Sequence, residues 1–102
     1  MTRPAILTPL ARAELRAAIH KLDNTAARRA LNDAVEAAAR HIGANPTLGA
    51  HRLQLASARY RFWSISRYRT LLAYTDATDP PRIVRIVHTS QDLPRVLADL
   101  LD

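Results

Sequence analysis

The sequence contains no cysteine and only two glycines, Gly43 and Gly49. Without cysteine the chain can form neither a disulfide nor a thiolate metal site. The four histidines are scattered and have no carboxylate beside them at the spacing of metal ligands. Two glycines are too few for a glycine-rich phosphate-binding loop. These absences predict a protein without a bound metal and without a nucleotide or redox cofactor.

Long hydrophobic runs are also missing. No apolar stretch approaches the roughly 20 residues that span a bilayer, and residues 1–4 are too short for a signal peptide. We therefore expect no membrane contact and a cytoplasmic protein, which the lack of cysteine fits. The length of 102 residues predicts one domain, residues 1–102, with a core that few elements share.

Acidic residues are scarce: the chain has nine of them and fifteen basic residues, which gives a net charge of +6. Fourteen of the basic residues are arginine. This balance predicts an anionic partner such as nucleic acid, a nucleoprotein machine or an acidic protein. Arginine bias from a GC-rich, alanine-rich genome explains the composition equally well. Position favours a partner, because one short predicted sheet region holds Arg59, Arg61, Arg67, Arg69, Arg82 and Arg85.

The first half of the chain has the pattern of a strand followed by two helices. Residues 5–8 form a short apolar run, typical of a strand. Thr8 before Pro9 predicts a helix start, because threonine caps well and proline loses no hydrogen bond at the first helical position. A second helix is predicted over residues 26–42, with Gly43 just past its end. The short connection between the helices predicts an antiparallel helical hairpin.

The second half predicts a sheet. Three strands are expected over residues 59–63, 68–74 and 82–88, joined as an antiparallel meander. The loop at 75–81 is polar and ends in two prolines, and residues 89–92 resemble a capping box before a short C-terminal helix. The predicted fold class is α+β, with the helices on one face of a mainly antiparallel sheet. The core beneath those helices is expected to include Tyr60, Phe62, Leu72 and Tyr74.

The basic and aromatic sheet suggests two kinds of chemistry. Its guanidinium groups could bind phosphates while tyrosine or tryptophan stacks on bases. A metal-independent ribonuclease could use the same parts, with arginine stabilising charge on the phosphate and His88 moving protons. The plainer alternatives are that edge arginines guard against strand aggregation and that His88 caps or packs. The candidate phosphate-binding or target-binding residues are Arg59, Arg61, Arg67 and Arg69.

Short motifs follow one another along nearly the whole chain. They are Leu-Thr-Pro-x-Ala from Leu7, an Asn-Pro-x-x-Gly link from Asn45, Arg-Tyr-x-Phe from Arg59, Tyr-Arg from Tyr68, and Ile-x-Arg-Ile-x-His-x-x-x-Asp-Leu from Ile83. In this order and spacing they resemble the RelE/ParE superfamily of toxins from type II toxin–antitoxin systems, and most closely the ParE branch. The resemblance implies that superfamily's fold and a small bacterial toxin, neutralised by a cognate antitoxin in a toxin–antitoxin hetero-oligomer.

The resemblance implies one of two targets. RelE-branch toxins cut mRNA in the ribosomal A site, whereas ParE-branch toxins poison DNA gyrase and block replication without known catalysis of their own. A RelE-type reaction would use Arg69, His88 and Arg61. Such enzymes usually add basic or tyrosine residues after the last strand, where residues 89–91 here are Thr-Ser-Gln. We therefore expect a gyrase inhibitor that acts by binding and is not an enzyme, with a ribosome-dependent mRNA endonuclease as the alternative.

The C-terminal stretch is dense in leucine and valine. If part of it is exposed, an apolar strip there suits antitoxin binding, by strand addition or by a helix in a groove. A helix that closes the core explains the pattern equally well. Under the first interpretation, Leu97→Asp would weaken antitoxin binding more than folding. Arg82 and Arg95 are further candidates to pair with an acidic antitoxin tail. The predicted antitoxin-binding residues are Leu93, Val96, Leu97, Leu100 and Arg85.

Overall fold

The computed structural model describes residues 2–101, and its elements follow one another in the predicted order. The helices are α1 (Pro9–His20), α2 (Thr25–Ala44) and the short α3 (Leu93–Val96). The strands are β1 (Ile6–Leu7), β2 (Tyr60–Ile65), β3 (Thr70–Thr75) and β4 (Arg82–His88). The 3-10 turns are η1 (Ser66–Tyr68) and η2 (Ala98–Leu100). The α+β class is confirmed, and within residues 2–101 no helix is long and apolar enough to cross a membrane.

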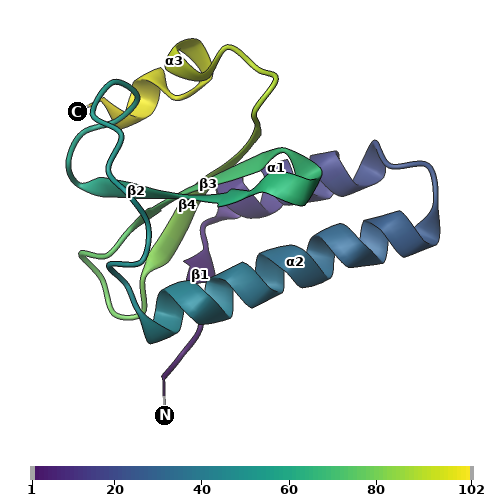
Figure 1. Cartoon of the computed structure of the whole chain (residues 1–102), viewed down its shortest axis with the longest axis horizontal. Coiled ribbons are helices and arrows are strands. Elements are labelled where there is room, and N and C mark those ends of the chain that lie inside the picture. The colour runs from purple at the N-terminus through teal and green to yellow at the C-terminus, as the bar shows by residue number, and fades with distance from the viewer. Residues whose placement is uncertain (1, 102) are drawn as a thin grey trace.

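The sheet has the strand order β1-β4-β3-β2 (Figure 1). β2, β3 and β4 form the predicted antiparallel meander, in which Ile65 pairs with Thr70, and Thr70 pairs with His88. β1 pairs in parallel with only the first two residues of β4. From Val84 onward, β4 therefore has no neighbouring strand on that side within the described chain.

Local signals place the start of α1 correctly and that of α2 to within one residue, but not the end of α2. The Thr8 hydroxyl accepts a hydrogen bond from the Ala11 N–H at 3.2 Å, and Pro9 is the first helical residue, as predicted. α2 runs to Ala44, so Gly43 lies inside its last turn and the prediction of a terminating glycine is wrong. A Cβ at Gly43 would overlap the Arg3 carbonyl oxygen. The glycine is needed because the N-terminal segment passes so close to α2.

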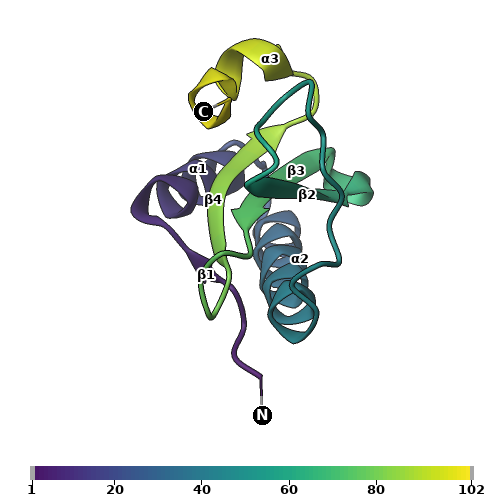
Figure 2. The ribbon, with the colours of Figure 1, turned by 90° about the vertical axis from the view of Figure 1, so that its left-hand side faces the viewer.

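The sheet is covered on both faces, by α1 and α2 on one and by the C-terminal segment (residues 93–101) on the other (Figure 1 and Figure 2). β3 is buried along nearly its whole length for this reason. Leu72 and Tyr74 lie under the helices, as predicted. The same prediction is wrong for Phe62 and Tyr60, which pack on the opposite face. Alternation along the strands could not distinguish the faces, because a sheet covered on both sides has no polar face.

The C-terminal segment closes the second part of the core. Leu97 is fully buried and Leu100 nearly so, and the Ser57 N–H donates to the Leu100 carbonyl oxygen at 2.8 Å. The sequence allowed either an exposed apolar strip or a helix that closes the core, and the second holds for these two leucines, whereas Leu93 and Val96 are half-buried. Burial is favoured because an uncovered second face would leave large apolar side chains in water.

The capping box predicted at residues 89–92 does not form. Asp92 precedes α3, but its side chain makes no capping hydrogen bond. Pro94 has no N–H to offer, and the Arg95 N–H donates to the Asp92 carbonyl oxygen instead. The two residues before Asp92 turn back toward the end of β4, where they contact His88.

Candidate functional site

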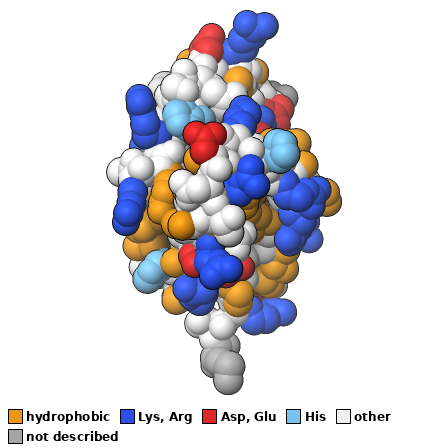
Figure 3. All heavy atoms as spheres, turned by 90° about the vertical axis from the view of Figure 1, so that its right-hand side faces the viewer, with side chains coloured by type: hydrophobic (Ala, Val, Ile, Leu, Met, Phe, Trp, Pro, Cys, Tyr) orange, Lys and Arg blue, Asp and Glu red, His pale blue; other side chains and the backbone are white. Residues whose placement is uncertain are grey.

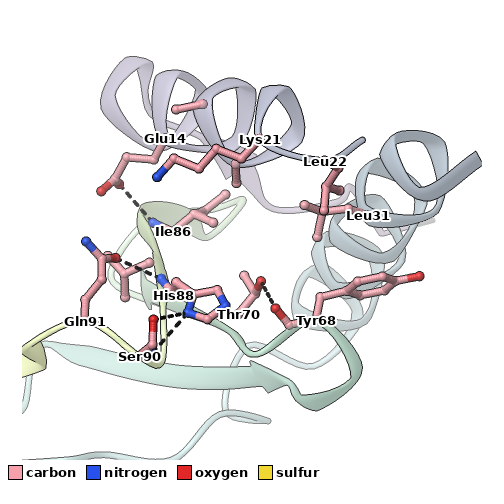
Figure 4. A pocket seen from close by; sticks show the side chains of 13 residues that line it. Glu14, Lys21, Leu22, Leu31, Tyr68, Thr70, Ile86, His88, Ser90 and Gln91 are labelled. Carbon is pink, nitrogen blue, oxygen red and sulfur yellow. Dashed lines mark hydrogen bonds between the residues drawn. The ribbon is translucent and has the colours of Figure 1, made fainter. Parts of the chain in front are cut away.

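A groove of about 510 Å³ opens between α1, the start of α2 and the η1 end of the sheet (Figure 4). Its apolar floor comes from helices and sheet together and includes Ala18, Leu22, Leu31, Tyr68 and Ile86. Its polar rim is formed by Glu14, Lys21, Thr70, His88, Ser90 and Gln91. An apolar floor with a few polar groups around it is the usual composition of a binding site. The described residues hold no group of histidine, cysteine, aspartate or glutamate side chains arranged for a metal ion.

The open edge of β4 forms one wall of this groove. Beyond Ile83 no strand of the described chain pairs with it, so side chains take the place of a strand. The Ile86 N–H donates to Glu14 Oε1 at 3.0 Å, and the His88 N–H donates to Gln91 Oε1 at 3.0 Å. An unpaired N–H in a partly buried position would cost free energy. Glu14 and Gln91 therefore close the edge.

Arg85 connects Glu14 to the C-terminal segment. Its Nε lies 3.1 Å from both Glu14 oxygens, and its Nη2 lies 3.0 Å from Glu14 Oε2. Its Nη1 donates to Val96 O at 2.8 Å and to Asp99 Oδ1 at 2.7 Å. The hydrogen bonds to Glu14 raise the pKa of Arg85, so its guanidinium stays charged. Pairing of Arg85 with an antitoxin tail stays a prediction, and it would require exchange of these internal partners.

Arg69 and His88, two of the three candidate RelE-type residues, lie at the same end of the sheet. His88 pairs with Thr70, and the Thr89 N–H donates to the Arg69 carbonyl oxygen at 2.8 Å. Arg69 has a left-handed backbone with φ 50°, a conformation that favours glycine or asparagine. This backbone closes the turn, since the Arg69 N–H donates to Ser66 O at 3.1 Å, and it leaves the arginine side chain exposed.

The imidazole of His88 is held by Ser90 (Figure 4). The Ser90 N–H donates to His88 Nδ1 at 3.1 Å, and Ser90 Oγ lies 2.6 Å from the same nitrogen. A backbone N–H can only donate, so Nδ1 accepts and the proton of the neutral ring sits on Nε2. In that tautomer the ring offers its Nε2–H as a hydrogen-bond donor.

Arg61, the third candidate, lies elsewhere. It pairs with Tyr74, four residues along β3 from Thr70, which places it about 14 Å away along the strands. Its Nε lies 2.9 Å from Asp76 Oδ2, and its Nη1 donates to Gly49 O at 3.0 Å. Arg61 therefore stabilises the opposite end of the sheet and does not share a site with the other two residues.

The predicted target-binding arginines divide into two groups. Arg59 directly precedes β2 and Arg61 is its second residue, whereas Arg67 and Arg69 flank Tyr68 of η1, a residue that lines the groove. Lys21 on the groove edge joins the second group, and we call Lys21, Arg67 and Arg69 the basic rim. All three are exposed, and within residues 2–101 none of them forms an ion pair. Figure 3 views this end of the molecule, where blue basic side chains outnumber red acidic ones.

The sequence analysis missed the two charged residues that line the groove, Glu14 and Lys21. Glu14 lies in α1 and Lys21 caps its C-terminal end, and their spacing of seven positions places them on one side of the helix beside its apolar stripe. That spacing is a signal for a polar helix edge. It does not reveal that Glu14 accepts a hydrogen bond from a backbone N–H of β4. That N–H is available because β1 pairs with only two residues of β4, which the sequence does not show.

Comparison with protein-family models finds a match over residues 5–93. The matching family is described as the ParE toxin of the type II toxin–antitoxin system, parDE. The matched range begins just before β1 and ends at the first residue of α3, so it contains the sheet, both long helices and the groove between them. No curated protein matches the chain.

Proposed function

The chain belongs to the family of ParE toxins of type II toxin–antitoxin systems, and from this we propose that it inhibits DNA gyrase by binding and is neutralised at its groove by a cognate antitoxin. The family makes the protein a toxin with an antitoxin partner. One observation supports binding over catalysis: Arg61 is remote from Arg69 and His88, whereas a ribonuclease needs such groups around one phosphate.

The basic rim supports contact with an anionic target. Its three cations are exposed; Lys21 lines the apolar groove, and Arg67 and Arg69 flank Tyr68, which also lines it. Charge attraction and apolar burial can therefore act on the same partner. Gyrase works on DNA, whose phosphates are a dense source of negative charge. A toxin of this kind needs no chemistry of its own, because gyrase itself cleaves the DNA. Such a target also implies a cytoplasmic protein.

We expect the purified toxin to inhibit supercoiling by DNA gyrase and to accumulate linear plasmid. Arg69→Ala and His88→Ala should each keep inhibition within about threefold of the unchanged protein, because each removes one contact among several and no reacting group. A titration of toxin in supercoiling and DNA-cleavage assays measures both effects.

The same three proteins are tested for mRNA cleavage on ribosomes, and circular dichroism of each variant confirms that it is folded. If gyrase is untouched, mRNA is cut and both substitutions abolish the cutting, the protein is a RelE-type endonuclease and the proposal fails.

The groove is our proposed place for the antitoxin. Its floor is apolar, it is open in the free toxin, and its basic rim suits an acidic segment. Ala17 is exposed and lines the groove. Ala17→Trp should therefore fill the groove without removing a core contact and weaken antitoxin binding by more than about tenfold. Isothermal titration calorimetry with the partner antitoxin measures the affinity, and urea denaturation measures the stability.

Ala13→Trp is the matched control, because Ala13 is also exposed on α1 but does not line the groove. Equal weakening by both substitutions, or by neither, would place the antitoxin elsewhere. Leu93 and Val96, the half-buried members of the set predicted from the sequence, would then be the next residues to change.

A further inference from the structure

The groove and the C-terminal segment lie on opposite faces of the sheet, yet one side chain contacts residues on both. Arg85 leaves β4 at its open edge and binds Glu14 on the helical side and Asp99 on the other. Only 13% of the Arg85 side chain is exposed, compared with 19% for Glu14 and 55% for Asp99. Arg85 thus joins the helical layer, the sheet and the C-terminal segment, and Glu14 is the better buried of its two acidic partners.

Glu14 determines how the Arg85 guanidinium is oriented. Its carboxylate binds Nε and Nη2 together, and it is itself held by the Ile86 N–H. A bidentate pair of this kind fixes the plane of the guanidinium. In that plane Nη1 points at Val96 O and Asp99 Oδ1. The C-terminal segment is thus held by a side chain whose orientation is set on the other side of the sheet.

We propose that the two ion pairs of Arg85, with Glu14 and with Asp99, couple the groove to the C-terminal segment. Glu14 lines the groove, so a ligand that brings a cation or an N–H donor to its carboxylate competes with Arg85, frees the guanidinium and loosens the segment on the opposite face. The coupling belongs to the toxin itself and does not depend on whether the antitoxin or another partner occupies the groove. Binding on one face then changes the surface that the other face presents.

Loss of the Glu14 contact is expected to loosen the C-terminal segment, although Arg85 would keep Asp99 as a partner. Asp99 is more than half exposed, and one such carboxylate compensates poorly for keeping a charged guanidinium largely out of water. Arg85 therefore turns toward solvent when Glu14 is lost, and the Val96 carbonyl oxygen loses its donor. Movement of Arg85 toward Asp99 would tighten the segment instead, and amide hydrogen exchange distinguishes the two.

The proposal is tested by amide hydrogen exchange at Ser57, measured on the folded protein. The Ser57 N–H donates to Leu100 O, so its exchange reports release of the C-terminal segment and not local opening of a helix. Glu14→Gln keeps the size of the side chain and removes the charge that orients Arg85. We expect it to speed Ser57 exchange about tenfold. Asp99→Asn should cause a smaller increase, because Arg85 then keeps both Glu14 and the Val96 carbonyl oxygen. In the double variant the effects should not multiply, because both substitutions act through Arg85.

Glu36→Gln is the matched control, since Glu36 is an exposed carboxylate on α2 that does not line the groove. The reference amide is that of Ala5, which donates to Ala39 O in the helical layer. Unchanged or slower exchange at Ser57 in the Glu14→Gln protein overturns the proposal, and so does full multiplication in the double variant. Equal acceleration at Ser57 and Ala5 also overturns it, because that pattern indicates loss of global stability.

Discussion

Leu97→Asp is expected to leave the protein unfolded at room temperature. Leu97 is completely buried on the second face of the sheet, in a cluster with Phe62 and Leu100. A carboxylate there would lose apolar burial and have no partner for its charge. The free energy of unfolding should fall by more than about 4 kcal/mol, which approaches the whole stability of a small domain. Circular dichroism and urea denaturation measure the loss, which reverses the sequence-based expectation that antitoxin binding would suffer first.

Leu101→Asp provides the comparison, because Leu101 is 52% exposed. The same chemical change there should alter the free energy of unfolding by less than about 0.5 kcal/mol. A Leu97→Asp protein that stays folded but no longer binds antitoxin would contradict the burial described here. It would support a C-terminal segment that detaches and serves the antitoxin.

The second large effect is expected for the double variant Arg67→Glu/Arg69→Glu. Two cations of the basic rim become anions, so attraction for an acidic or DNA-bearing partner turns into repulsion. Gyrase inhibition should weaken about hundredfold. Both side chains are exposed, so the free energy of unfolding should change by less than about 1 kcal/mol. Supercoiling titrations at low and high salt measure the effect, which should shrink as salt screens the charges.

Arg12→Glu/Arg16→Glu changes the net charge by the same amount on α1, where both arginines are exposed and neither lines the groove. This variant should keep gyrase inhibition within about threefold. Equal loss in the two double variants would mean that net charge, and not the basic rim, carries the effect. No loss in either would remove the basic rim from the gyrase-contacting surface.

Elements governed by neighbouring residues were predictable. β4 has the predicted bounds of residues 82–88, because its run of β-branched side chains favours a strand whichever strand it pairs with. α1 begins at Pro9 as predicted, because the Thr8 cap acts within one turn. The resemblance to ParE toxins, which rests on motifs spread along the chain, is confirmed by the family match over residues 5–93.

The candidate site was predictable only in part. Arg69 and His88 were recognisable as candidates from their motifs, and the antiparallel ladder does bring them to one end of the sheet. Nothing local reveals that the register of β2 on β3 carries Arg61 toward the opposite end. Nor does the sequence show that Ser90 turns back and donates its N–H to His88 Nδ1, because residues 89–92 have the pattern of a helix cap, which does not form.

The sequence by itself determined the fold class, the order of elements, the basic charge and the family. Only the tertiary structure decided which face buries Phe62 and Leu97, why Gly43 has no room for a side chain, and what closes the open edge of β4. The physical reason is the distance along the sequence over which each interaction acts. Caps, turns and strand propensity act between residues a few positions apart, whereas burial and edge pairing join residues such as Glu14 and Arg85, which are 71 positions apart.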